Sequence, residues 1–208
     1  MALVGGGRFP FEWSSKVVIY DEILQKRITT ISFNKAEVKG IHITKKYLIV
    51  ALESTTYIYL VNENFVPLTK IDTAINNKGI FSLVQINDEY LIAVPYQKDD
   101  SQRLEGNILI KNLDKLDQTQ VIKAHNHPII NITFNHSGSL LATASRQGTL
   151  IKIWETATGQ CITMIRRGYD ICTIHQLAFD ATDNWIVCIN DQKAIGIFSL
   201  TERLVDKK

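Results

Sequence analysis

Five short runs of apolar residues with interspersed polar residues recur along the chain, and each is rich in the β-branched and aromatic residues that favour strands. They cover residues 16–21, 56–61, 107–112, 149–154 and 194–199. With Tyr20, Leu60, Lys111, Trp154 and Phe198 taken as equivalent, the intervals are 40, 51, 43 and 44 residues. A period of roughly 40–45 residues is typical of WD40-type propellers, in which each repeat forms one four-stranded blade.

The residues before the fourth run supply the other parts of such a repeat. Ile130, Ile132 and Phe134 alternate with polar neighbours, which predicts a half-buried strand. A turn cluster at 135–138 and a second strand over 140–144 follow. No long amphipathic helix is predicted anywhere. The pattern predicts an all-β protein with the WD40-type β-propeller fold. A sandwich or a barrel is the alternative, against which the regular period argues.

The predicted domain organisation is a single propeller domain over residues 1–208, with a polar loop insertion at 97–106 in the longest interval. At roughly 43 residues per unit, the chain holds about five blades. A propeller must close on itself to protect the edges of its sheets. We therefore expect a partial propeller, belonging to a longer protein or completed by another chain.

Charge is unevenly distributed. The formal net charge of the 208 residues is only +2, so the molecule as a whole is not a polycation that seeks nucleic acid. The segment from Ser145 to Gly168 nevertheless contains four basic residues and one acidic residue. An anion-binding site is therefore expected in this segment.

Several other classes of function lack support in the sequence. The longest uninterrupted apolar run, 47–52, is far too short to span a bilayer, and the N-terminus has no secretory pattern. Three cysteines at no metal-like spacing indicate reduced thiols in a cytosolic protein. His125 and His127 have no third ligand at a recognisable spacing. We expect no metal, no cofactor and no enzymatic activity.

Three motifs together indicate a family. They are Ala124-His125, the turn Ser145-Arg146-Gln147-Gly148-Thr149, and Ile165-Arg166-Arg167-Gly168. In this combination the segment 122–168 closely resembles the PROPPIN family of phosphoinositide-binding propellers, the WIPI and Atg18-like group. Weaker similarity extends from Leu3 to Phe198.

The resemblance implies a seven-bladed propeller that binds phosphatidylinositol 3-phosphate, and often the 3,5-bisphosphate, through two sites on one rim. It implies a cytoplasmic protein located peripherally on phagophore or endosomal membranes. The expected partners are therefore a phosphoinositide-containing membrane and autophagy proteins, with no nucleic acid. Members of the family also insert a long loop of the sixth blade into the bilayer, and this chain ends about where that loop should begin.

Residue by residue, the resemblance implies a first phosphoinositide site formed by His125, Thr143, Ser145, Gly148, Thr149, Lys152 and Arg166. Lys152 replaces the arginine usual in the family, which preserves the charge but not the planar fork. The weaker second site would comprise Arg167, Gly168, Asn190 and Lys193. There, Ala194 and Gly196 replace a threonine and a histidine. We expect one competent site and one weak or absent site.

The chemistry of this assignment is that of polyanion recognition. A phosphorylated inositol ring requires charged groups, hydroxyls and backbone amides that converge from different strands. His125 would donate more strongly when protonated, near its unperturbed pKa of ~6.5. Because adjacent side chains of an extended segment point to opposite faces, Arg166 and Arg167 should serve different sites. The alternative function is a protein-interaction scaffold, or a partial paralogue, that has lost lipid binding.

Overall fold

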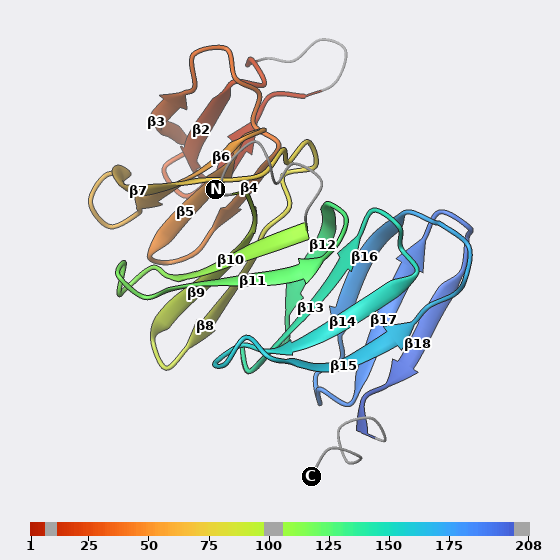
Figure 1. Ribbon diagram of the computed structural model, residues 1–208. Coiled ribbons are helices and arrows are strands. Elements are labelled where there is room, and N and C mark those ends of the chain that lie inside the picture. The colour runs from red at the N-terminus through yellow and green to blue at the C-terminus, as the bar shows by residue number, and fades with distance from the viewer. Residues whose placement is uncertain (7–11, 98–105, 202–208) are drawn as a thin grey trace. The chain divides into compact units, whose positions relative to one another are not determined.

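The computed structural model of the protein describes residues 1–6, 12–97 and 106–201 (Figure 1). These residues form strands β1–β18, arranged in five antiparallel sheets, and the predicted all-β class is confirmed. The chain divides into two compact units, Met1–Gly79 and Ile80–Lys208. The predicted insertion at 97–106 lies, apart from its two end residues, outside the described residues, and the single domain stays a prediction.

The first unit contains two sheets. The three-stranded sheet comprises β1 (Ala2–Val4), β2 (Lys16–Asp21) and β3 (Lys26–Ser32). The four-stranded sheet comprises β4 (Gly40–Ile43), β5 (Tyr47–Ala51), β6 (Thr55–Leu60) and β7 (Val66–Asp72). Their shared core includes Val17, Ile19, Phe33, Leu48 and Val50.

The second unit contains three sheets. The first comprises β8 (Ser82–Ile86), β9 (Glu89–Tyr96), β10 (Gly106–Asn112) and β11 (Thr119–His125). The second comprises β12 (Ile129–Phe134), β13 (Leu140–Ser145), β14 (Leu150–Glu155) and β15 (Cys161–Arg166). The third comprises β16 (Ile174–Phe179), β17 (Trp185–Asn190) and β18 (Ile195–Ser199).

Every sheet is a meander, in which strands that are consecutive in sequence are neighbours in space. The five recurring runs predicted from the sequence are β2, β6, β10, β14 and β18, with ends that agree to within one residue. In each four-stranded sheet the run is the third strand. The repeat unit inferred from spacing alone is therefore the structural unit.

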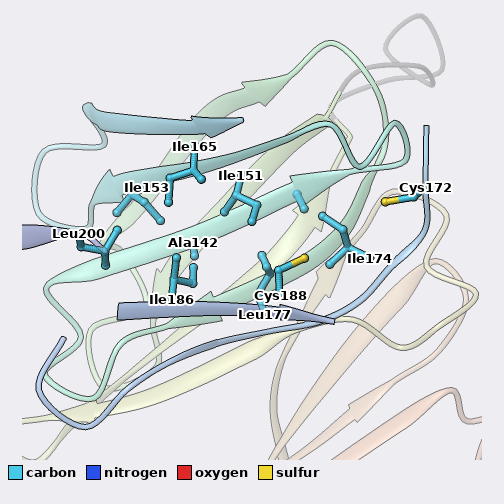
Figure 2. Packing of buried hydrophobic residues seen from close by; sticks show 11 residues of the cluster. Ala142, Ile151, Ile153, Ile165, Cys172, Ile174, Leu177, Ile186, Cys188 and Leu200 are labelled. Carbon is cyan, nitrogen blue, oxygen red and sulfur yellow. The ribbon is translucent and has the colours of Figure 1, made fainter. Parts of the chain in front are cut away.

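Because side chains alternate between the two faces of β14, its residues contribute to two different cores. Ile151 and Ile153 are fully buried and pack with Ile186 and Cys188 of the next sheet (Figure 2). Trp154 belongs to the other core, which β12–β15 shares with β8–β11. The β12–β15 sheet thus offers one apolar face to β8–β11 and the other to β16–β18.

The last sheet also carries apolar side chains on the face that lacks a following sheet among the described residues. Ile189 of β17 lies opposite Ile195 of β18, and Val187 lies opposite Ile197. Ile195 and Ile197 are exposed. By register they correspond to the fully buried Ile151 and Ile153 of β14.

Candidate functional site

One face of the β12–β15 sheet gathers the main predicted residues of the first site. Directly opposed residues of antiparallel strands share a face. Thr143 is opposite Lys152, and Lys152 is opposite Met164. Leu150 is opposite Arg166 in the same alternation. Thr143, Lys152 and Arg166 therefore lie on one face.

A buried hydrogen-bond network occupies the inner part of that face. The hydroxyl of Thr143 lies 2.9 Å from Nε2 of His125 and accepts a 2.9 Å hydrogen bond from Nε1 of Trp154. Nζ of Lys152 donates to the carbonyl oxygen of Ala124 at 2.7 Å and lies 5.6 Å from the centre of the Trp154 ring. His125 and Thr143 are thus bonded to each other inside the protein.

The environment of His125 changes what it can do. The side chain is only 5% exposed. Burial, reinforced by the nearby Lys152 ammonium, lowers the pKa of His125 from 6.5 to about 4, although the hydrogen bond with Thr143 partly opposes this. The expectation of a histidine that protonates near its ordinary pKa is therefore wrong. At neutral pH the ring is uncharged.

The turn between β13 and β14 has a conformation that only glycine adopts freely. The amide of Gly148 donates to the carbonyl oxygen of Ser145 at 2.8 Å, and Gly148 has a φ of +64°. A Cβ atom at this position would overlap the carbonyl oxygen of Cys172. The glycine thus allows the loop after β15 to pack directly on the turn.

Arg166 ends β15 with its side chain exposed. Its guanidinium lies over the ring of Tyr169, 5.2 Å from the ring centre. Within the described residues it has no ion-pair partner. The neighbouring residue Thr149 is half-buried, and its carbonyl oxygen accepts the amide of Arg167 at 2.9 Å. Arg166 is therefore a charged group next to the turn that remains available for an anion.

Arg167 is used differently from Arg166, in hydrogen bonds within the protein. Its Nε donates to the carbonyl oxygen of Gly148 at 2.9 Å, and one terminal nitrogen donates to Oε1 of Gln192 at 3.0 Å. The other terminal nitrogen donates to the carbonyl oxygen of Asp170. The guanidinium joins the β13–β14 turn, the β15–β16 loop and the β17–β18 turn.

The remaining residues of the predicted second site lie around this arginine. Oδ1 of Asn190 accepts the amides of Gln192 at 3.0 Å and Ala194 at 3.3 Å, so its side chain closes the β17–β18 turn. Lys193 is exposed and has a φ of +58°, the conformation of Gly148 in the preceding sheet. A Cβ atom on Gly168 would meet no other atom within 4 Å.

Two partners of these residues were not predicted. Trp154 was identified as a repeat position, but not as a hydrogen-bond donor to Thr143. The signal that could have identified this donor is an indole at a buried position of a strand, since a buried N–H requires an acceptor. Gln192 could not be predicted as a partner of Arg167, because a glutamine in a turn carries no distinctive sequence pattern.

Other kinds of site have less support in the structure. Within residues 1–6, 12–97 and 106–201, no three histidine, cysteine or acidic side chains are arranged to hold a metal ion. No helix in the same ranges has the length and apolarity needed to cross a membrane. The three cysteines are free thiols, and burial raises the pKa of Cys188 to about 11.

Comparison with known sequences gives relatives along almost the whole chain. SVP1-like protein 2 of Schizosaccharomyces pombe is 30% identical over 200 residues, which cover 96% of this chain and 53% of that protein. Autophagy-related protein 18e of Arabidopsis thaliana is 28% identical over 200 residues, covering 96% and 51%. The chain thus spans about half the length of these relatives.

Solved structures show the same fold. Kluyveromyces lactis Hsv2 matches with a TM-score of 0.74 at 20% identity, over 89% of this chain and 55% of that one. KlAtg21, in its complex with the coiled coil of AgAtg16, matches with a TM-score of 0.78 at 23% identity, over 96% and 63%. The family model described as PROPPIN matches residues 14–207. This chain therefore belongs to the PROPPIN family and carries about five blades of its β-propeller.

Proposed function

We propose that this chain is a non-enzymatic adaptor that binds membranes containing 3-phosphorylated phosphoinositides. The ligand would be phosphatidylinositol 3-phosphate, with the 3,5-bisphosphate as a second candidate. The observation that carries the proposal is the state of Arg166. It is exposed and without an ion-pair partner among the described residues, and it belongs to the Arg-Arg-Gly motif that the family resemblance assigns to the phosphoinositide sites.

The groups around Arg166 supply the remaining chemistry. A guanidinium fork suits a phosphate, and a desolvated pair of this kind is among the stronger polar contacts. Ser145 and Thr149, at the two ends of the β13–β14 turn, carry hydroxyls that can donate to a phosphate or a ring hydroxyl. Gly148 supports the site indirectly, because its missing side chain lets the β15–β16 loop pack on the turn.

The buried residues of the first site take supporting roles in this proposal. His125 and Thr143 satisfy each other and hold one end of the network. The ammonium of Lys152, bonded to the carbonyl oxygen of Ala124, contributes positive potential from a fixed point. We assign direct contact with the headgroup to Arg166 and Thr149, and positioning to the other members, including Ser145, which is only 5% exposed.

The second site is proposed to bind weakly or not at all. Arg167 donates to three oxygens of the protein, and Asn190 accepts two amides of its own turn. Binding a headgroup there would require breaking some of these hydrogen bonds. Lys193 is the one exposed cation left among the four predicted residues.

The proposed setting follows the relatives. One is named an autophagy-related protein, and the solved KlAtg21 is bound to a coiled coil of AgAtg16. We propose that this chain, too, locates peripherally on membranes of the autophagy pathway and contacts autophagy proteins.

The test is flotation with vesicles that contain or lack phosphatidylinositol 3-phosphate. Replacing Arg167 would also remove three internal hydrogen bonds, so Arg166→Thr alone is the informative variant. We expect it to weaken lipid-dependent binding by about 10-fold or more, with an unchanged melting temperature. Lys26→Thr makes the same charge change at an exposed position of β3 and should bind within about 2-fold of the unmodified chain. Equal binding by Arg166→Thr would overturn the proposal.

A second candidate function is a protein-interaction scaffold without lipid binding. The internal engagement of Arg167 and Asn190 favours it, because a single remaining site gives no avidity. Absence of flotation by a folded chain that still captures an autophagy-protein partner would support this candidate.

A further inference from the structure

The loop between β15 and β16, residues 167–173, presents two large apolar side chains to solvent. Tyr169 is 86% exposed and Ile171 is 72% exposed. Between them, Asp170 uses its carbonyl oxygen to accept a hydrogen bond from Arg167. The next residue, Cys172, is buried in the core between β12–β15 and β16–β18 (Figure 2). The two apolar side chains therefore project to solvent from a loop that is tied to the protein by the carbonyl oxygen of Asp170 and by the buried Cys172.

The loop is held by several hydrogen bonds, so the exposure of Tyr169 and Ile171 is set by the fold. Besides the bond from Arg167, the amide of Cys172 donates to the carbonyl oxygen of Gln147 at 3.2 Å. The amide of Thr173 donates to Oδ2 of Asp191 at 3.1 Å. These bonds fix the loop to the β13–β14 turn on one side and to the β17–β18 turn on the other.

The same hydrogen bonds place the loop among basic side chains. Arg146 is exposed in the β13–β14 turn next to Gln147, and Lys193 is exposed in the β17–β18 turn two residues after Asp191. Arg166 lies directly over the ring of Tyr169. With Arg167, four basic residues surround the loop, against the carboxylates of Asp170 and Asp191. This end of the second unit attracts anions.

We propose that Tyr169 and Ile171 form an interfacial anchor that enters the headgroup–acyl boundary of an anionic bilayer beside the phosphoinositide site. Apolar and aromatic side chains flanked by basic residues are the composition that binds such an interface. The inference rests on the proposed function for the orientation of this end toward the membrane. This anchor lies in the β15–β16 loop and is distinct from the long loop of the sixth blade that members of the family insert into the bilayer.

A second exposed apolar pair lies in a different charge environment and provides a comparison for Tyr169 and Ile171. Ile23 and Leu24, in the turn between β2 and β3, are also exposed, Ile23 at 93%. Asp21 and Glu22 precede them and Lys26 and Arg27 follow, so the charges around this turn balance. Isolated exposed apolar residues are ordinary on protein surfaces, and this turn has no excess of positive charge that would attract an anionic bilayer. Ile23 therefore serves as a matched control for Ile171.

The experiment measures flotation with vesicles of phosphatidylcholine and phosphatidylserine, with or without phosphatidylinositol 3-phosphate. It compares the unmodified chain with Ile171→Ser, Ile23→Ser, Tyr169→Ser and Tyr169→Leu. Loss of a partly inserted isoleucine should weaken vesicle binding by about 10-fold. Tyr169→Leu keeps an apolar group but removes the ring from Arg166, so it should bind better than Tyr169→Ser. Binding of the soluble headgroup, inositol 1,3-bisphosphate, should be the same for the unmodified chain and Ile171→Ser.

The outcomes separate this inference from the proposed function. Lipid-dependent flotation that falls with Ile171→Ser and not with Ile23→Ser supports the anchor. Equal flotation of Ile171→Ser and the unmodified chain overturns the anchor and leaves the phosphoinositide site standing. Flotation that ignores phosphatidylinositol 3-phosphate but falls with Ile171→Ser supports the anchor and overturns the phosphoinositide site. No flotation of the unmodified chain overturns both.

Discussion

The last residues of β11 and β15, in two successive sheets, both belong to the predicted first site, and the protein uses them in opposite ways. His125 ends β11 opposite Gly106, the first residue of β10, and Arg166 ends β15 opposite Leu150, the first residue of β14. His125 is buried and bonded to the next sheet, whereas Arg166 is exposed.

The difference originates in the face of its sheet on which each side chain lies. His125 meets the next sheet, where Thr143 and Trp154 provide a hydroxyl and an indole N–H. Arg166 lies on the opposite kind of face, the one that carries Thr143 and Lys152, whereas its neighbour Ile165 packs in the core shared with β16–β18. One position thus becomes part of the interior and the other stays free for a ligand. A motif residue cannot be assigned to binding without knowing which face of its sheet it occupies.

The β13–β14 turn, with Gly148, and the β17–β18 turn, with Lys193, differ in the same way in how tightly they are packed. Gly148→Ala, in the first of them, should have the largest effect. The new Cβ would overlap the carbonyl oxygen of Cys172 at a φ of +64°, so the β15–β16 loop would have to move. We expect a loss of about 3 kcal/mol in the free energy of unfolding, measured by chemical denaturation. A loss below about 0.5 kcal/mol would show that the loop does not pack on this turn.

The buried histidine gives the next largest effect, through pH. The unfolded chain binds a proton at His125 near pH 6.5, but the folded chain does so only near pH 4. The free energy of unfolding should therefore decrease as the pH falls from about 6.5 to about 4, by up to ~3 kcal/mol from this group. Melting temperatures across this range should fall less steeply for His125→Gln.

The exposed His127, two residues away, provides the control for that series. His127→Gln should retain the pH dependence of the unmodified chain, because this side chain lies at the surface. If His125→Gln and the unmodified chain lost stability in parallel on acidification, the burial of His125 would not be what separates it from Arg166.

The smallest effect is expected in the second turn, where Lys193 has the φ of Gly148 without the tight packing. Lys193→Gly removes the strain of a left-handed backbone in a residue with a side chain. It should stabilise the protein by ~0.5 kcal/mol, or leave it unchanged if unfolded-state entropy offsets the gain. Denaturation midpoints at neutral pH would measure it, and a loss above 1 kcal/mol would mean that the lysine side chain is needed in its turn.

Much of the fold could be predicted from the sequence, because the signal is local. The recurring runs around Tyr20, Leu60 and Trp154 are strands whose composition and spacing carry their own evidence. The shared face of Thr143, Lys152 and Arg166 also follows from strand alternation once the register is known. The assignment of these residues to a phosphoinositide site came from family resemblance and stays a prediction.

What could not be predicted depends on contacts between sheets. The low pKa of His125 requires knowing that Thr143 and Lys152 surround it. Arg167 links two loops by donating to the carbonyl oxygens of Gly148 and Asp170. This role could not be predicted, because the positions of backbone oxygens leave no pattern in the side-chain sequence. The same holds for Tyr169 and Ile171, whose exposure reflects the path of a pinned loop.

The exposed pair Ile195 and Ile197 has a consequence for how this protein behaves in a cell. Their counterparts Ile151 and Ile153 are sealed in a core, so among the described residues the last sheet presents a face of interior composition. Such a surface, bordered by a strand edge, promotes self-association and recognition by chaperones. Solubility and lifetime should therefore depend on whatever covers this sheet, and a charged substitution at Ile195 should improve the yield of soluble protein.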